Sequence, residues 1–255
     1  MSFKKEIEER LNVVELNHEL KKSAYEFMKA SLLSKYSYNY TWMDRPIIQY
    51  PQDMMAMQEL VWQVKPDLII ETGIAHGGSL IMNASYLAML DYCDAIECNE
   101  SLDPRKTKRR VLGIDIDIRE HNRQAIESHP MSNRIDMIQG SSISPEIIDQ
   151  VKNYAKNYKR ILISLDSNHT HQHVLEELKA YASLTSLDSY CVVFDTIVQD
   201  IPKELSGDRP WGPGDNPKTA VWEYLKTHPE FEIDNSIENK LLVTVAPNGY
   251  LRRIK

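Results

Sequence analysis

Carboxylates, glycines and histidines gather in this sequence at the places where apolar runs end. The first buried-looking run carries Glu71 near its end, and a turn with Gly73, Ala75 and Gly77 follows, then Ser79. Glycine lets the backbone approach a ligand closely, and the start of a following helix offers it free N–H groups. An acid at this place suits a ligand that carries an ammonium group. These five residues are therefore candidate contacts of a small-molecule ligand.

Two interpretations of the glycine turn compete. A dinucleotide fingerprint requires G-x-G-x-x-G, and the turn GIAHGG lacks the middle glycine at that spacing. The E/D-x-G-x-G-x-G turn of S-adenosylmethionine (SAM) methyltransferases fits Glu71, Gly73 and Gly77, with Ala75 in place of one glycine. The turn favours SAM, and a nucleotide-dependent oxidoreductase stays as an alternative.

The next two apolar runs end in residues that suit an adenosine ligand. The run VLGIDID contains Asp115 and Asp117, and a carboxylate there can accept hydrogen bonds from both hydroxyls of a ribose. The following run ends in Gly140, Ser141 and Ser142, which suit small polar contacts around an adenine ring. Three strand ends that fit one ligand support the SAM interpretation.

A second group of ionisable residues follows the fourth and fifth runs, which end in Asp166 and Asp195. Two carboxylates at neighbouring strand ends can hold a hard divalent cation such as Mg²⁺ or Mn²⁺. The alternative is that Asp166 caps the next helix. His169 and His173 would share a helix face if that helix began near residue 169, whereas we expect His171 to be solvated.

Other metal enzymes fit this sequence less well. A non-haem iron hydroxylase needs His-x-Asp/Glu and a distant later histidine. The match is His228 with Glu230, and no histidine follows it. A zinc hydrolase that uses the three closely spaced histidines lacks a strong spacing match.

Strands and helices that would position these residues alternate along the chain. Strands are expected over 67–72, 109–117, 134–141, 159–167 and 189–196. Helices are expected over 51–64, 77–91, 119–129, 144–157, 171–184 and 220–228. This alternation, with strands that are continuous apolar runs, predicts an α/β fold with a doubly wound, mainly parallel sheet. Ligands of such sheets bind at the carboxyl ends of the strands.

The two ends of the sequence read differently from this alternating part. Residues 2–34 predict one or two helices, 36–52 a loop, and 241–255 a late strand or hairpin that could be antiparallel. We therefore divide the chain into an N-terminal helical and loop extension, 1–50, and a ligand-binding domain, 51–255.

Composition limits the partners of the protein. Its 255 residues carry a net charge of −7 without a long basic run, which disfavours a nucleic-acid partner. Three cysteines form no even disulfide framework, no apolar run is long enough for a membrane span, and no signal-peptide pattern is present. We expect a cytoplasmic protein, a homo-oligomer that acts on a small molecule.

Several blocks of the sequence resemble the cephalosporin hydroxylase family: QYPQDMMAMQELVWQVKPDLIIETGIAHGGS, GIDIDIR, LDSNHTHQHVLEELKAYASL, VVFDT and RPWGPGDNPKTAVWEYL, within residues 38–255. Despite that name, the resemblance implies the Rossmann-like class I fold of SAM-dependent methyltransferases. Relatives include sugar and rhamnosyl O-methyltransferases and enzymes that modify antibiotics. The resemblance implies SAM bound at Glu71, Gly73 and Asp115.

The resemblance also implies a Mg²⁺-type site at Asp166 and Asp195, with His169 as the candidate general base. Some members have an acid directly before the second aspartate, and Phe194 stands there in this chain. Residues 209–217 could form a lid over the acceptor, with Trp211 stacking on a sugar ring, or an ordinary surface loop.

The expected function is therefore a metal-assisted O-methyltransferase that acts on a hydroxyl of a sugar, a nucleotide sugar or a related small molecule. Besides the oxidoreductase, the alternative is a SAM-binding or nucleotide-binding accessory protein without catalytic activity.

Overall fold

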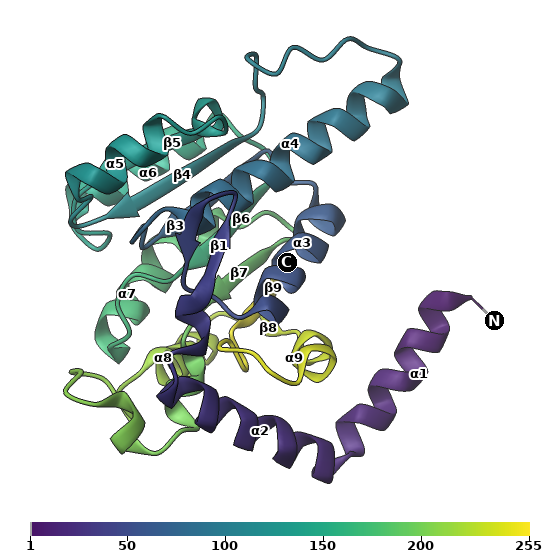
Figure 1. Ribbon diagram of the computed structural model, residues 1–255, viewed down its shortest axis with the longest axis vertical. Coiled ribbons are helices and arrows are strands. Elements are labelled where there is room, and N and C mark those ends of the chain that lie inside the picture. Colours follow the sequence, from purple (N-terminus) through teal and green to yellow (C-terminus); the bar gives the residue numbers. More distant parts are fainter. Residues whose placement is uncertain (1) are drawn as a thin grey trace.

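A seven-stranded sheet forms the centre of the protein, described by a computed structural model for residues 2–255 (Figure 1). The strand order is β5-β4-β3-β6-β7-β9-β8. β9 pairs antiparallel with both of its neighbours, and the pairings from β5 to β7 are parallel. The predicted α/β class and mainly parallel sheet are confirmed.

The strands of the sheet are β3 (Leu68–Thr72), β4 (Arg110–Asp115), β5 (Ile135–Gln139), β6 (Ile161–Leu165), β7 (Tyr190–Val193), β8 (Phe231–Ile233) and β9 (Tyr250–Arg253). The helices are α1 (Phe3–Leu16), α2 (His18–Leu33), α3 (Pro51–Val64), α4 (Gly78–Cys98), α5 (Glu120–Glu127), α6 (Pro145–Ala155), α7 (His171–Tyr181), α8 (Pro217–Leu225) and α9 (Asn235–Leu241).

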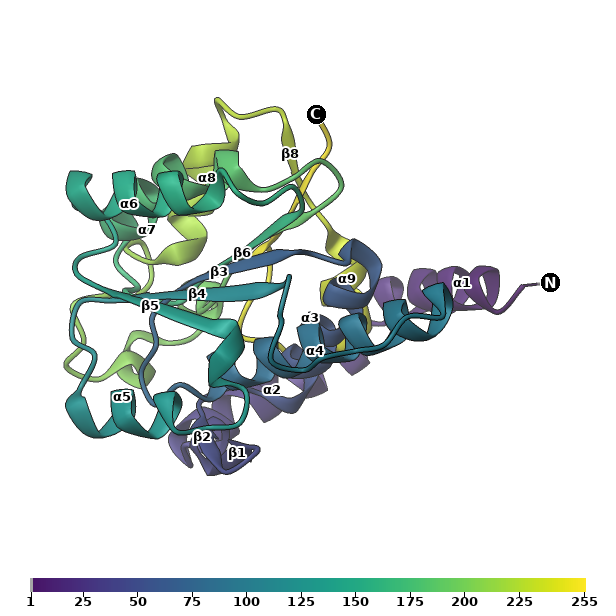
Figure 2. The ribbon, with the colours of Figure 1, turned by 90° about the horizontal axis from the view of Figure 1, so that it is seen from above.

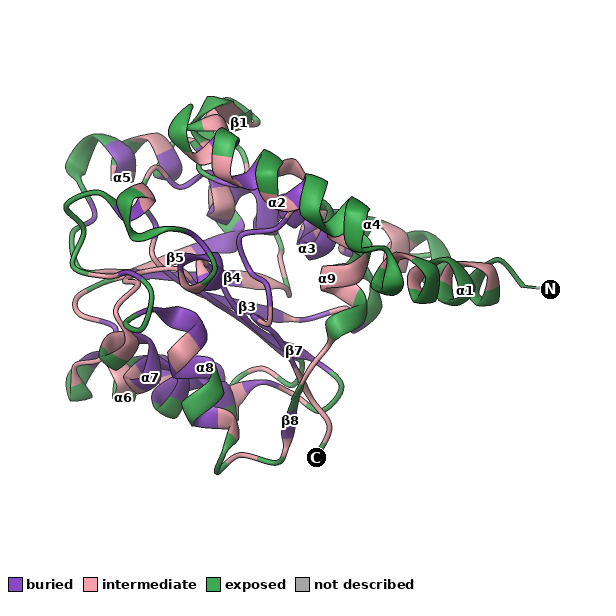
Figure 3. Ribbon diagram, turned by 90° about the horizontal axis from the view of Figure 1, so that it is seen from below, coloured by how far each residue is buried: buried purple, intermediate pink, exposed green. Residues whose placement is uncertain are grey.

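Helices cover both faces of the sheet, with α6, α7 and α8 on one face and α3, α4 and α5 on the other (Figure 2). Successive residues of β3 alternate between these two layers, since Ile69 packs in the core beneath α3 and α4, and Leu68 and Ile70 pack in the core beneath α6 and α7. All five residues of β3 are buried, as the continuous apolar run predicts, and the sheet is buried throughout its centre (Figure 3).

The N-terminal segment forms two helices, α1 and α2, and α1 projects from the body with no buried residue (Figures 1 and 3). The segment 36–52, expected as a loop, contains a 3-10 turn and a hairpin of β1 (Tyr40–Trp42) and β2 (Arg45–Ile47). Met43 and Asp44 form its two-residue turn with φ of 46° and 67°, the left-handed geometry that matches the twist of a tight hairpin.

The end of the chain differs from the expectation in two respects. The strand expected over 241–255 is confined to β9, and its outer partner β8 was not predicted because three residues give too short a pattern. Within residues 2–255, no helix has both the length and the apolar character that crossing a membrane requires.

Candidate functional site

A cavity of about 460 Å³ opens at the carboxyl ends of β3, β4, β6 and β7. Its volume is in the range of small-molecule sites. The lining residues predicted from the sequence are Gly73, Ala75, Ser79, Asp115, Asp166, His169, Asp195 and Trp211. The N-terminal segment contributes as well, because Lys35, Tyr38, Ile47 and Tyr50 also line the cavity. The division at residue 50 thus stays a prediction, and the cavity contains residues from both sides of it.

The backbone of the glycine turn is forced into its shape by close packing. Gly73 has φ of 89°, and a Cβ there would overlap the carbonyl oxygen of Asp166, so the first turn residue sits directly against the end of β6. Ala75 has φ of 46°, a left-handed conformation in which an L side chain is strained. This strain explains why a glycine is the usual residue at that place of the turn.

Two polar side chains hold the turn from outside, and no local sequence pattern predicts either of them. Arg45 of β2 donates to the carbonyl oxygen of His76, with Nε at 3.1 Å. Asn122 of α5 donates to the carbonyl oxygen of Ala75 at 2.9 Å and accepts from Arg45 at 3.2 Å. The N-terminal hairpin and α5 therefore position the ligand-facing backbone.

Asp115 at the end of β4 lines the cavity beside the turn. Its Oδ2 accepts from the backbone N–H of Ile74 at 2.7 Å and of Ala75 at 3.3 Å. Oδ1 accepts from the backbone N–H of Asp117 at 3.0 Å, so one lone pair of Oδ1 stays available for a ribose hydroxyl. Asp117 lies outside the cavity, and its side chain is 70% exposed.

Glu71 is only 2% exposed and does not line the cavity. Both carboxylate oxygens face α4, where one accepts from Ser79 Oγ and the other from Asn83 Nδ2 at 2.9 Å. Burial raises the pKa of Glu71 to about 7, although these two hydrogen bonds oppose the rise. Glu71 therefore fixes the N-terminus of α4 and the cavity residue Ser79, rather than presenting its carboxylate to the cavity.

The third predicted strand end lies outside the lining of the cavity. Gly140 donates its N–H to the carbonyl oxygen of Asp115 at 2.8 Å, which ties the ends of β4 and β5 together. Ser142 is buried, and its hydroxyl lies 3.1 Å from Nε2 of His173. Ser141 belongs to the same turn and is half-buried. Contacts of these three residues with an adenine ring stay a prediction.

Asp166, His169 and Asp195 come together at the ends of β6 and β7. One ligand atom from each of the three residues lies within 4.8 Å of the other two. Nε2 of His169 is 3.0 Å from Oδ2 of Asp195. Asp195 has φ of 55°, a strained left-handed conformation of the kind that gathers at functional sites. Asp166, His169 and Asp195 were all predicted at this edge, and the structure brings the three side chains together there.

The charges of this cluster fit a bound cation. Burial and the neighbouring carboxylate of Asp195 raise the pKa of Asp166 well above its usual range. Within residues 2–255, neither carboxylate forms an ion pair with lysine or arginine. Phe194 is buried and brings no carboxylate, so the donor set is two aspartates and one imidazole. Such a set suits a divalent metal ion.

The histidines of this segment do not lie as expected from a helix that begins near residue 169. α7 begins at His171, and His169 precedes it, so His169 and His173 share no helix face. His171 is not solvated as expected, since Nδ1 lies 2.8 Å from Thr219 Oγ1 and its backbone N–H donates to Asp215 at 2.7 Å. A distant aspartate thus caps α7, and Asp166 is free to face the cavity.

The segment after β7 forms the outer wall of the cavity. The rings of Trp211 and His169 pack perpendicular to one another, with centroids 4.8 Å apart and planes at 88°. Trp211 also lines the cavity, so the expectation of an ordinary surface loop does not describe this residue. Its ring limits the directions from which an acceptor reaches His169.

Comparison with known proteins identifies the family of the chain. The family model described as Rhamnosyl O-methyltransferase/CmcI matches residues 34–254. A Rhamnosyl O-methyltransferase of Mycobacterium tuberculosis is 31% identical over 206 residues, which are 79% of this chain and 73% of that protein. The Mycobacterium leprae protein of the same name is 29% identical over 219 residues, 84% of this chain and 82% of that protein.

Solved structures share the fold. A CmcI structure with Mg and SAM has a TM-score of 0.54 at 17% identity and covers 86% of this chain and 78% of its own. A CmcI structure with S-adenosylhomocysteine (SAH) has a TM-score of 0.55 at 20% identity, with coverages of 85% and 83%. The chain belongs to the Rhamnosyl O-methyltransferase/CmcI family and is an enzyme of this SAM-dependent O-methyltransferase family.

Proposed function

We propose that the protein transfers the methyl group of SAM to a hydroxyl of a sugar or sugar derivative, with a divalent cation held by Asp166 and Asp195. One observation carries this proposal: the glycine turn, Asp115 and the cluster of His169 with two aspartates line one cavity. The names of the mycobacterial relatives, which are rhamnosyl O-methyltransferases, support a sugar as the acceptor.

The residues along this edge of the sheet have separate roles. Gly73 and Ala75 bring backbone close to the cosubstrate, and Asp115 accepts a hydrogen bond from a ribose hydroxyl. When bound, SAM supplies an electrophilic methyl group, and the cation lowers the pKa of the acceptor hydroxyl. His169 would take the proton of that hydroxyl, and SAH would be the leaving group when the methyl group passed from sulfur to the hydroxyl oxygen. Because methyl transfer asks little covalent chemistry of a protein, positioning by these residues dominates the rate.

Trp211 and Asp195 restrain His169 for this role. The side chain of His169 is 12% exposed and contacts both Asp195 and the ring of Trp211. A histidine positioned in this way can act as the general base that accepts the hydroxyl proton.

The proposal is tested by calorimetry followed by a transfer assay. SAM and SAH should bind in the absence of acceptor. A screen of free sugars, sugar phosphates, nucleotide sugars and small glycosides should then give a product that is heavier by one methylene, together with stoichiometric SAH.

The outcomes separate the alternatives. Binding of SAM without turnover of any acceptor would favour an accessory protein, and binding of NAD in preference to SAM would favour an oxidoreductase. Full turnover in excess chelator would refute the role of the cation while leaving methyl transfer intact.

A further inference from the structure

Two cations, Lys35 and Arg209, line the same cavity as the proposed catalytic residues. Lys35 joins α2 to the 3-10 turn of Tyr36–Asn39, and Arg209 lies in the segment after β7. Neither forms an ion pair with a carboxylate in the described part of the chain, 2–255. The protein has a net charge of −7, so two positive side chains without a carboxylate partner at one cavity suggest an anionic ligand there.

The position of these cations follows from the strand order. Along the sheet edge, β4 with Asp115 is followed by β3, then β6 with Asp166, then β7 with Asp195. The segment with Arg209 follows β7, and α2, which ends just before Lys35, packs against the 3-10 turn of Lys203–Ser206 in that segment. The cations therefore lie beyond the aspartate pair, on the side away from the ribose position at Asp115.

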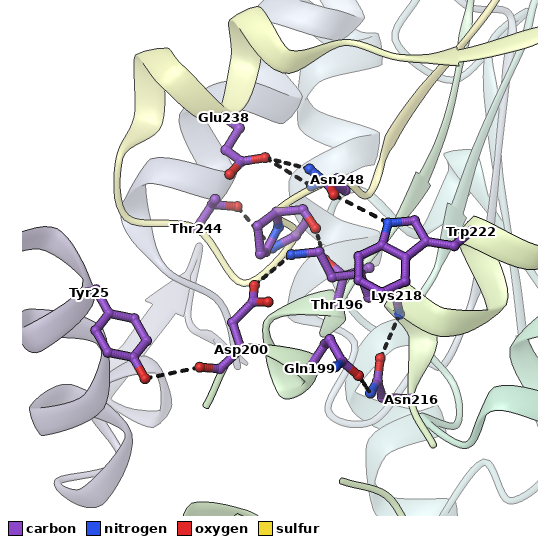
Figure 4. Close-up of polar contacts among 12 residues, drawn as sticks. Tyr25, Thr196, Gln199, Asp200, Asn216, Lys218, Trp222, Glu238, Thr244 and Asn248 are labelled. Atoms are coloured by element: carbon purple, nitrogen blue, oxygen red, sulfur yellow. Dashed lines mark hydrogen bonds and ion pairs between the residues drawn. The ribbon is translucent and has the colours of Figure 1, made fainter. Parts of the chain in front are cut away.

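The wall that presents Arg209 is anchored at both ends (Figure 4). At one end, Asp200 pairs with Lys218 of α8 at 2.6 Å, and its carbonyl oxygen accepts from Tyr25 of α2 at 3.0 Å. At the other end, Asn216 donates to Gln199 at 2.6 Å. The segment that carries Arg209 is thus tied to α2 and to the start of α8 at its two ends.

Aromatic groups flank the Arg209 guanidinium. It lies 5.2 Å from the centroid of the Trp211 ring, and Nη2 donates to the hydroxyl of Tyr38 at 3.4 Å. Stacking and this hydrogen bond orient the planar fork and leave its other N–H groups free for an acceptor of paired hydrogen bonds. Phosphate oxygens fit this fork, and Lys35, which lines the same cavity, adds a point charge.

We propose that Lys35 and Arg209 bind a phosphate group of the acceptor, so that the substrate is a sugar phosphate or a nucleotide sugar. This inference rests on the proposed methyl transfer, and it names the acceptor class. The phosphate lies on the side of the cavity away from the ribose position at Asp115, and the sugar lies between, with a hydroxyl near His169.

The test measures binding of probes to the SAH-loaded protein without added metal, by calorimetry. The probes are inorganic pyrophosphate, rhamnose 1-phosphate, dTDP-rhamnose, glucuronate and the neutral methyl rhamnoside. We expect the two phosphorylated sugars to bind at least about tenfold tighter than the neutral glycoside, because each cation adds a charge-assisted hydrogen bond. The affinities of rhamnose 1-phosphate and dTDP-rhamnose, compared with one another, show whether the site prefers a sugar monophosphate or a nucleotide sugar.

Charge-removing variants assign the effect to the two residues. Lys35→Gln and Arg209→Gln should each weaken binding of pyrophosphate and phosphorylated sugars by about tenfold or more and leave binding of the methyl rhamnoside and SAM unchanged. The matched control is Lys226→Gln, which removes an exposed charge outside the cavity lining and should change none of these affinities.

Three results would overturn the phosphate assignment: pyrophosphate fails to bind, glucuronate binds as tightly as rhamnose 1-phosphate, or the control weakens binding as much as the two cavity variants. Turnover of a neutral sugar with no phosphate binding would support the proposed methyl transfer and contradict only the phosphate assignment. Phosphate binding at Lys35 and Arg209 with no methyl transfer to any probe would support the phosphate assignment and contradict the proposed methyl transfer.

Discussion

The imidazole of His169 and the carboxylate of Asp195 meet across the ends of two neighbouring strands, with Nε2 3.0 Å from Oδ2. His169 reaches this position from the segment before α7 and Asp195 from the end of β7. The same contact allows His169 two roles, a base that Asp195 orients or a third donor to a cation. The two roles predict different effects of replacing His169.

We expect His169→Ala to lower turnover by about 10² to 10⁴, the usual contribution of a general base, with SAM and cation affinity retained. The measurement is kcat over a pH series, in which the low-pH limb should disappear. His121→Ala, an exposed histidine outside the cavity, is the control and should leave the profile unchanged. If cation affinity falls in proportion to activity, His169 is instead a metal donor.

Replacing Asp166 should distinguish the repulsion between the Asp166 and Asp195 carboxylates from the stabilisation that a bound cation gives. Asp166 and Asp195 repel one another in the absence of a cation, so Asp166→Asn should unfold at a higher temperature than the wild type in chelator. Added Mg²⁺ or Mn²⁺ should raise the melting temperature of the wild type and not of the variant, because binding to the folded state stabilises it. Equal stabilisation of both proteins would place the cation elsewhere.

Asp115→Ala should weaken SAM binding by about tenfold or more, because the variant loses both a ribose acceptor and the bonds that hold the turn at Ile74 and Ala75. Asp117→Ala is the neighbouring control. Its side chain is 70% exposed and outside the cavity, so we expect a change below about twofold. Calorimetry with SAM and SAH gives both numbers. Equal losses in the two variants would mean that net charge, and not the Asp115 contacts, governs binding.

Glu71 should make stability depend on pH. Its pKa rises from 4.5 to about 7 on folding, chiefly through burial, so the folded state binds a proton more tightly than the unfolded state. Stability from this group is complete below the unfolded pKa and is lost as pH rises toward 7, by about 3 kcal/mol in total.

The variant Glu71→Gln removes this dependence. Near pH 5 it should match the wild type, and at pH 8 it should be more stable by about 2 to 3 kcal/mol in urea unfolding. The glutamine amide can donate to Oδ1 of Asn83, which is buried without a partner in the described residues. Glu100→Gln, at an exposed position, should leave the pH slope of the wild type in place. Parallel pH curves for Glu71→Gln and the wild type would contradict the assignment.

The sheet and its functional edge could be predicted because their signals are local. Buried parallel strands give continuous apolar runs, and Asp115, Asp166 and Asp195 each follow such a run directly. The fold then brings the carboxyl ends of those strands together without further information. The placement of Asp166 and Asp195 at one edge therefore needed no knowledge of distant contacts.

Other features depend on contacts between residues far apart in the chain. The cap of α7 comes from Asp215, 44 residues beyond His171, so no local pattern shows where that helix begins. The support of the glycine turn by Arg45 likewise joins the N-terminal hairpin to the domain. The orientation of Glu71 was missed because a strand pattern does not say whether an acid near its end faces the cavity or the next helix.

The insertion of β9 between β7 and β8 has a consequence for synthesis on the ribosome. The segment before β9 holds the strand that carries Asp195, since Val193 donates to Gly249 at 2.8 Å and Ile197 to Val245 at 3.1 Å. During translation, the glycine turn and Asp115 emerge and can pair their strands early, whereas Asp195 lacks its neighbour until this late segment has emerged. The nascent chain can therefore assemble the side of the cavity with the glycine turn and Asp115 first, and the side with Asp195 is complete only when β9 joins the sheet.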